Sequence, residues 1–364
     1  MNDDAIRRNS RRIGLISTAV IVVVSLVTAT LLDPGTFAGP VATFVLCYLP
    51  VQIVLSGMWA QHPDRLTGWS LPVRGGALLV AALVLGAVAE LVFLATVGGG
   101  RGPSTPQIAM FSIVVVVATF WLAIVFEAWP FARISNGIIA TLALLLTVYT
   151  VALVLYYLLF DFSFLPAPAQ TSQTPSGAFN AWYVLTFLVT AIGGMFLPPA
   201  FGFLGFERLH QPVRGLAWTA LCLAWAAALF GIGVGALRVD PVDFLVWVTV
   251  PVLFGGLIPL VVFRDSLFGG QRRRPLRGVC NVLALAVLGV IMVWIYHRVA
   301  GFVSPPVSWG PPTYQGQVWI ASATLAFTFP LLATHADFFD HWPLRRTRGT
   351  APAVSSDAEQ MPGV

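Results

Sequence analysis

The sequence predicts an all-α polytopic membrane protein with about ten transmembrane helices and both termini in the cytoplasm. Ten apolar stretches of about 20 residues follow one another along the 364-residue chain. Hydrophobic residues make up 57% of the chain and charged residues only 10%, and the basic residues gather on one side of the predicted membrane. Apolar stretches of this length match the bilayer core, where a helix satisfies its own backbone hydrogen bonds.

In chain order, we place the spans at residues 13–32, 40–60, 75–97, 107–129, 137–160, 181–205, 215–236, 244–263, 278–300 and 317–335. The first span is long for the core of a signal peptide, and no small-residue cleavage site follows it, so we expect it to be retained. The predicted domains are a cytoplasmic segment (1–12), a transmembrane domain (13–335) and a cytoplasmic tail (336–364). The tail is expected to be disordered from about residue 347, because it is small, polar and proline-containing.

The arginines orient the predicted spans. All 20 basic residues are arginine, and only Arg101, Arg238 and Arg298 fall on one side, whereas the other seventeen fall on the opposite side. Short cytoplasmic loops concentrate basic residues, so this asymmetry predicts a multi-pass protein of the cell (inner) membrane with both termini inside. It also accounts for the net charge of +5 without a nucleic-acid partner. The expected partners are the lipid bilayer and a small-molecule solute, and a homo- or hetero-oligomer is left open.

Similar sequences at the ends of several spans indicate an internal repeat. Glu127-Ala128-Trp129-Pro130 ends the fourth span, and Asp340-His341-Trp342-Pro343 follows the tenth. Pairs of prolines 13 residues apart occur at Pro50 and Pro63, Pro199 and Pro212, and Pro330 and Pro343. Similarity at corresponding positions is typical of repeated units, so a two-helix unit used about five times is one interpretation. The alternative is chance, because the chain contains 26 prolines.

Glu90 is the one acid placed well inside a predicted span, about two turns from its outer end. A charged group in hydrocarbon is costly, so such a residue is a candidate for substrate binding or proton coupling. His297 and Arg298, near the outer end of the ninth span, are its nearest predicted partners in depth. A Glu90–Arg298 pair would be either a proton or substrate site or a structural ion pair.

A second candidate is a cluster of polar side chains at the cytoplasmic ends of the helices. Its members are His62, Glu127, Glu207, His210, Asp265, His335, Asp337, Asp340 and His341. Imidazole and carboxylate groups suit a divalent metal, but the spacing matches no known ligand motif, so a metal is left unknown. A solvated interface and a proton relay are the other interpretations.

Glycine and proline interrupt two of the even-numbered spans. Gly193, Gly194 and Pro198 lie in the sixth span, and Gly255, Gly256 and Pro259 lie in the eighth. Transporters often bind substrate where such residues break a helix, because the unwound backbone supplies ligands. A packing kink without a ligand is the alternative.

The sequence contains no known catalytic or nucleotide-binding motif. P-loop, His-Glu-x-x-His and Gly-x-Ser-x-Gly patterns are all absent, so no catalytic residue is assigned, enzyme activity has no positive support and no cofactor is expected. The leading hypothesis is a permease for a small solute, either passive or proton-coupled through Glu90. The alternative is a non-transport subunit of a redox or biosynthetic complex, or a cofactor- or metal-binding membrane protein.

Overall fold

The computed structural model describes residues 3–61, 69–103, 105–263, 268, 274–303, 314 and 316–344. Ten helical segments in this part of the chain are long and apolar enough to cross a membrane. The two short parallel strands β1 (Phe160–Asp161) and β2 (Phe179–Asn180) form the one sheet among the described residues. The protein is therefore an all-α, multi-pass membrane protein, as predicted.

The odd-numbered spans are nearly continuous α-helices. They are α1 (Asp3–Leu31), α4 (Leu71–Ala95), α6 (Gly137–Leu159), α9 (Val213–Phe230, continued by a π-helix at Gly231–Ala236) and α12 (Arg274–Val303).

Each even-numbered span contains a segment with different helical winding. The second span consists of α2 (Pro34–Thr36), a π-helix (Phe37–Val41) and α3 (Ala42–Gln61), and the fourth of α5 (Pro106–Thr119) and a π-helix (Phe120–Val125). The sixth consists of α7 (Ala181–Gly193), a 3₁₀ turn (Gly194–Phe196) and α8 (Leu197–Ala200). The eighth consists of α10 (Pro241–Phe244), a π-helix (Leu245–Thr249), α11 (Val250–Leu257) and a second π-helix (Ile258–Val262). The tenth consists of α13 (Gln317–Ala321), a π-helix (Ser322–Thr328) and α14 (Phe329–Asp337).

Burial alternates along the chain with the same parity. In the even-numbered spans 72–78% of the most apolar stretch is buried, against 22–39% in the odd-numbered spans. We therefore call the even-numbered spans the inner spans and the odd-numbered spans the outer spans. In an apolar bilayer the outer spans can expose valine and leucine at little cost, because lipid tails are as apolar as these side chains.

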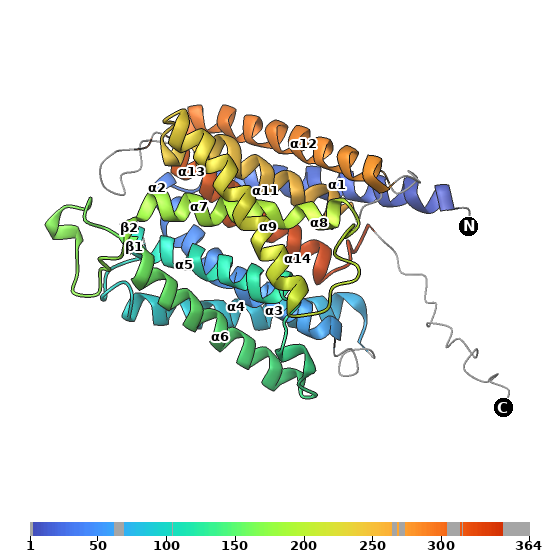
Figure 1. Ribbon diagram of the computed structural model, residues 1–364, viewed down its shortest axis with the longest axis horizontal. Helices are drawn as coiled ribbons and strands as arrows, with labels where there is room; N and C mark the ends of the chain where they lie inside the picture. The colour runs from blue at the N-terminus through green and yellow to red at the C-terminus, as the bar shows by residue number, and fades with distance from the viewer. Residues whose placement is uncertain are drawn as a thin grey trace.

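The five inner spans form a closed ring. α3 packs against α5, α5 against α7, α7 against α10 and α11, and α11 against α14. The ring closes because α14 and the π-helix before it return to α3. The outer spans pack on the outside of this ring, as α4 does against α3 and α12 does against α11 and α8 (Figure 1).

Glycines near the start of four outer spans allow close packing on the ring. Each is in close contact with an aromatic ring just beyond the end of an inner span, and an added Cβ would lie 2.1–3.0 Å from that ring. The pairs are Gly14 with Phe263, Gly75 with Phe339, Gly215 with Phe126 and Gly278 with Phe201. The same kind of contact thus recurs around the bundle at one end of the molecule.

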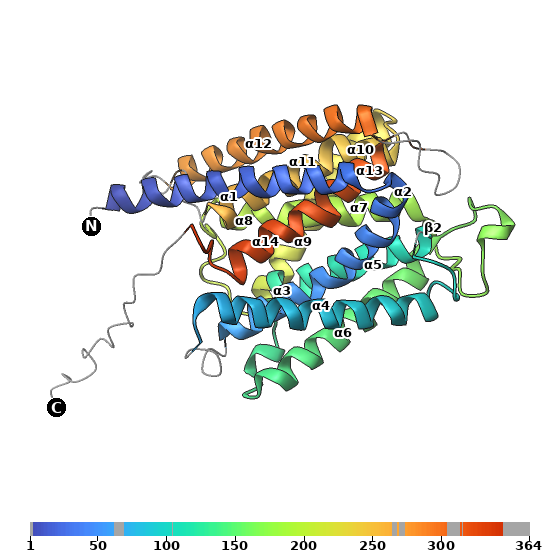
Figure 2. The ribbon, with the colours of Figure 1, turned by 180° about the vertical axis from the view of Figure 1, so that it is seen from behind.

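That end, which we call the Arg-rich end, also holds the start of α1 and the end of α14 (Figures 1 and 2). Eight of the arginines that the sequence assigns to the cytoplasmic side lie at this end: Arg11, Arg12, Arg74, Arg133, Arg208, Arg214, Arg274 and Arg277. The two described termini of the bundle therefore share one side, which is consistent with an even number of spans.

Candidate functional site

A cavity lies inside the ring of inner spans and is lined by residues from all five of them. At the Arg-rich end the last lining residues on the five spans are Leu49, Phe120, Ile192, Leu253 and Phe329. Toward the opposite end the first are Ala38, Ala109, Trp182, Val242 and Val318. The cavity therefore occupies the half of the ring that is farther from the arginines.

The cavity is small and almost wholly apolar. Its volume is about 90 Å³, and among the described residues that line it only Thr43, Ser322 and the indole of Trp182 carry a polar side-chain atom. An apolar protein cavity of about 150 Å³ holds benzene, so this one has room for a molecule of about four non-hydrogen atoms. None of the described lining residues is charged, which makes the site unsuitable for a bare ion.

Aromatic contacts lie at both ends of the cavity. At the Arg-rich end Phe120 and Phe329 meet edge to face, with ring centroids 6.0 Å apart. At the opposite end Trp182 meets Tyr314 edge to face at 5.4 Å and also contacts Phe164 at 6.4 Å. Rings packed in this way exclude water from the space between them.

Acidic groups surround the aromatic contact at the opposite end. Asp240 caps α10 by accepting a hydrogen bond from the backbone N–H of Val242 (2.8 Å), and the hydroxyl of Tyr314 donates to its other carboxylate oxygen (3.4 Å). The side-chain amide of Gln317 donates to Asp243 at 3.0 Å. Burial raises the pKa of the Tyr314 hydroxyl above its usual value, and the negative charge of Asp240 raises this pKa further. Tyr314 is therefore a neutral donor at physiological pH.

Glu90 lies outside the cavity. It projects from the outer helix α4 near Cys47, and the thiol of Cys47 is 3.6 Å from the hydroxyl of Ser112 on the neighbouring inner helix α5. Neither Cys47 nor Ser112 lines the cavity. Glu90 thus sits behind the wall formed by the second and fourth spans.

The structure does not bring Glu90 and Arg298 together, which corrects the predicted pair. α4 and α12 lie on opposite sides of the bundle, as both views show (Figures 1 and 2). The guanidinium of Arg298 stacks over Trp294 of its own helix at 5.0 Å, and the ring of His297 meets Trp247 at 4.7 Å. The sequence predicted a similar depth in the membrane for Glu90 and Arg298, but it did not predict where α4 and α12 lie around the ring.

The candidate glycines face other helices rather than the cavity. An added Cβ at Gly255 would lie 1.8 Å from the carbonyl oxygen of Leu285 in α12, and one at Gly256 would lie 2.4 Å from the ring of Phe196. Added Cβ atoms at Gly193 and Gly194 would meet Val252 and Cys222, each at 2.9 Å. Close helix packing thus accounts for all four glycines.

The prolines lie beside changes of helical winding. Pro198 is in α8, directly after the 3₁₀ turn, and Pro259 is in the second π-helix of the eighth span. Neither lines the cavity. The expected interruption of both spans is therefore present, although the cavity lies nearer the other end of the ring.

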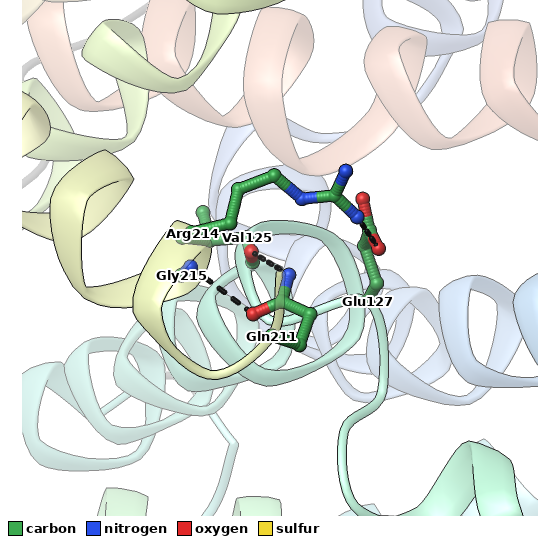
Figure 3. A network of polar contacts seen from close by, with 5 residues as sticks. All are labelled: Val125, Glu127, Gln211, Arg214 and Gly215. Atoms are coloured by element: carbon green, nitrogen blue, oxygen red, sulfur yellow. Dashed lines mark hydrogen bonds and ion pairs between the residues drawn. The ribbon is translucent and has the colours of Figure 1, made fainter. Parts of the chain in front are cut away.

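The predicted polar cluster at the Arg-rich end is divided into separate interhelical contacts. Glu127 forms an ion pair with Arg214, and Glu207 forms one with Arg274. Next to the first pair, Gln211 donates to the carbonyl of Val125 and accepts from the N–H of Gly215 (Figure 3). His210 accepts a backbone hydrogen bond from Arg214 in the same turn.

The remaining described members of the cluster lie around α14. The rings of His335 and His341 are 5.4 Å apart, and the hydroxyl of Ser17 is within 3.2 Å and 3.4 Å of their respective ring nitrogens. Asp337 accepts a hydrogen bond from Gln52, and Asp340 lies in the turn that follows α14 with a positive φ of 46°. His62 and Asp265 lie outside the described residues.

No group of three or more His, Cys, Asp and Glu side chains among the described residues is arranged to hold a metal ion. Sequence reasoning also missed the residues that line the cavity, above all Ser322, Phe120 and Phe329. Apolar residues in an apolar span have no distinguishing chemistry, so only the three-dimensional arrangement identifies them. A comparison with known proteins found no matching family, no similar curated protein and no similar solved structure.

Proposed function

We propose that this protein is a permease in which a small solute crosses the membrane along the axis of the inner ring. The observation that carries the proposal is the cavity lined by all five inner spans. A bundle that needed only to be stable would fill its centre with side chains at close-packed density. A cavity at the centre of a closed ring instead gives a solute a place that is shielded from lipid.

The winding of the inner spans supports the proposal. All five contain a π-helical or 3₁₀ segment, whereas the outer spans are continuous α-helices apart from the end of the seventh. Mid-helix departures from α-helical winding are frequent at functional sites, and they weaken the regular backbone ladder. Inner spans built in this way can change shape while the outer spans hold the ring together.

The aromatic contact at the Arg-rich end is the proposed barrier. Phe120 and Phe329 come from the fourth and tenth spans and meet at the floor of the cavity. Each belongs to or adjoins a π-helix, so a change in winding would move its ring. The described conformation is then the closed form of the path.

We further propose that the chain consists of five copies of a two-helix unit. The alternation of inner and outer spans and the recurring glycine–aromatic contacts support this proposal. So do two consecutive residues with positive φ at Glu127 and Ala128, and again at Asp340 and His341. These turns follow the fourth and tenth spans at corresponding positions.

We propose passive movement of the solute, because the wall formed by the second and fourth spans lies between Glu90 and the cavity. The test is Glu90→Gln, which keeps the shape of the side chain and removes its charge. Solute flux and its dependence on a pH gradient should match those of the wild type in proteoliposomes. A loss of pH-gradient-driven uptake in this variant would instead assign proton coupling to Glu90.

The experiment that tests the permease itself is osmotic swelling of proteoliposomes in uncharged solutes such as acetamide, urea and glycerol. Phe120→Ala and Phe329→Ala should raise permeability severalfold over the wild type, because each removes one side of the barrier. Phe187→Ala is the matched control, since this ring lies on an inner span but contacts Phe230 instead of the cavity. Equal permeability of empty liposomes and of all four proteins would overturn the proposal.

A further inference from the structure

Ser322 places a hydroxyl group at the wall of the central cavity without a hydrogen bond to any described residue. Only 6% of the residue is exposed, so its surroundings are those of the protein interior. The hydroxyl has no protein partner among the described residues on a wall that is otherwise almost wholly apolar, so a hydrogen bond to a bound molecule would offset part of the cost of placing it there. A bound molecule that forms a hydrogen bond with the Ser322 hydroxyl would explain why a serine occupies this position.

The other hydroxyl groups of the same π-helix are satisfied within the protein. Thr324 donates to the carbonyl of Ile320, and Thr328 donates to the carbonyl of Ala323, both at 2.6 Å. Serine and threonine in membrane helices ordinarily bond to a preceding carbonyl in this way. Ser322 is thus distinguished both by its place on the cavity and by its unengaged donor.

Thr43 supplies the complementary group on a neighbouring inner span. Its hydroxyl donates to the carbonyl of Pro103 at 3.2 Å, so its hydrogen is engaged and its oxygen lone pairs remain as acceptors. The cavity wall therefore offers one free donor, at Ser322, and one acceptor, at Thr43. The other lining side chains are apolar, apart from the indole of Trp182.

We infer that the cavity binds a small uncharged carbonyl compound of the primary amide class, with its carbonyl oxygen on Ser322. This inference rests on the proposed permease and names the chemistry of its solute. An amide needs one donor and one acceptor from the wall and presents a short apolar body to the alkyl side chains. A molecule the size of acetamide, with four non-hydrogen atoms, also matches the volume of the cavity.

A charged solute fits the same site poorly. Transfer of an ion from water into an apolar environment without a countercharge is far more costly than transfer of a neutral polar group. No described residue on the wall supplies a countercharge. The selectivity expected from the site is therefore for neutral over ionised forms of solutes of equal size.

The test is the binding of acetamide to the purified full-length protein, measured by ligand-observed NMR. Ser322→Ala should weaken binding about three- to tenfold, as expected for the loss of one hydrogen bond. Ser112→Ala is the matched control, because Ser112 is a fully buried serine on an inner span that does not line the cavity. Xenon NMR on each variant establishes that the cavity persists, since xenon needs no hydrogen bond.

The outcomes separate this inference from the proposed function. Weaker acetamide binding in Ser322→Ala alone, with xenon binding retained, supports the inference whatever the proteoliposome flux is. Equal binding by the wild type and Ser322→Ala, or no binding by the wild type, overturns it. Permeability without acetamide binding would support the permease and exclude primary amides as its solute. Acetamide binding without permeability would support the amide site and exclude the permease.

Discussion

The hydroxyl groups of Tyr48 and Thr334 are 2.7 Å apart, and this hydrogen bond joins the first inner span to the last. One turn farther toward the Arg-rich end, the side-chain amide of Gln52 donates to Asp337 at 3.0 Å. Thr334 and Asp337 follow Phe329, and Gln52 follows Leu49, the residues at which the cavity ends on these two spans. The ring is therefore closed by side-chain hydrogen bonds between segments from the two ends of the chain.

The first prediction concerns the coupling between Tyr48 and Thr334. A double-mutant cycle with Tyr48→Phe and Thr334→Val should give a coupling free energy of about 0.6 kcal/mol and no more than about 1.7 kcal/mol, the range for hydrogen bonds between membrane helices. Unfolding of the purified protein in mixed micelles measures it. Strictly additive effects of the two substitutions would show that the hydrogen bond is absent from the folded state.

The second prediction concerns the contact between the eighth and ninth spans. An added Cβ at Gly289 would lie 1.9 Å from the carbonyl oxygen of Pro251, so Gly289→Ala should destabilise the protein by about 1–3 kcal/mol, as overpacking does. Gly301→Ala in the same helix meets nothing within 4 Å and should be neutral or slightly stabilising. Thermal unfolding of both variants measures the difference, and similar melting temperatures would contradict this packing.

The third prediction compares two neighbouring polar groups at the Arg-rich end. Gln211 satisfies two backbone groups, those of Val125 and Gly215, whereas Glu127 forms a partly exposed ion pair with Arg214 (Figure 3). Gln211→Ala should cost about 1–3 kcal/mol and Glu127→Gln less than about 1 kcal/mol. Denaturation at low and high salt provides the check, because only the ion pair is screened. A larger loss for Glu127→Gln would reverse this ranking.

The fourth prediction concerns Tyr314 at alkaline pH. The pKa of its hydroxyl is raised in the folded protein by burial and by Asp240, relative to about 10 in the unfolded chain. Its contribution to stability is therefore full below pH about 10 and is lost as the pH rises toward the folded pKa. Tyr314→Phe should show a shallower loss of stability above pH about 10 than the wild type. Parallel stability curves for the two proteins would mean that Tyr314 is not shielded as described.

The sequence was sufficient to predict the ten spans, because apolar length follows directly from bilayer thickness. It also held a partial signal for the inner spans. Pro50, Pro198, Pro259 and Pro330 all lie within even-numbered spans, where neighbouring helices can satisfy the backbone groups that proline leaves free. Ligand binding at Pro198 and Pro259 stays a prediction, whereas helix packing accounts for the glycines that precede them in the same two spans.

The candidate site was less accessible to sequence reasoning. Glu90 was identified by its charge, and the structure places it in α4. Its separation from Arg298 depends on how the outer spans are arranged around the ring, and no local pattern encodes that order. Ser322 resembles any other hydroxyl in a membrane helix until its neighbours are known, and the same holds for Phe120 among the 26 phenylalanines.

The packing of α1 has a consequence for the synthesis of the protein. This first helix contacts the π-helix that ends the eighth span, α12, and both the π-helix and α14 of the tenth span. Those partners leave the ribosome only after most of the chain has been made, which at ordinary translation rates takes on the order of tens of seconds. Until then α1 stands alone in lipid, and nascent chains that stop before the tenth span should leave it open to capture by a membrane chaperone or protease.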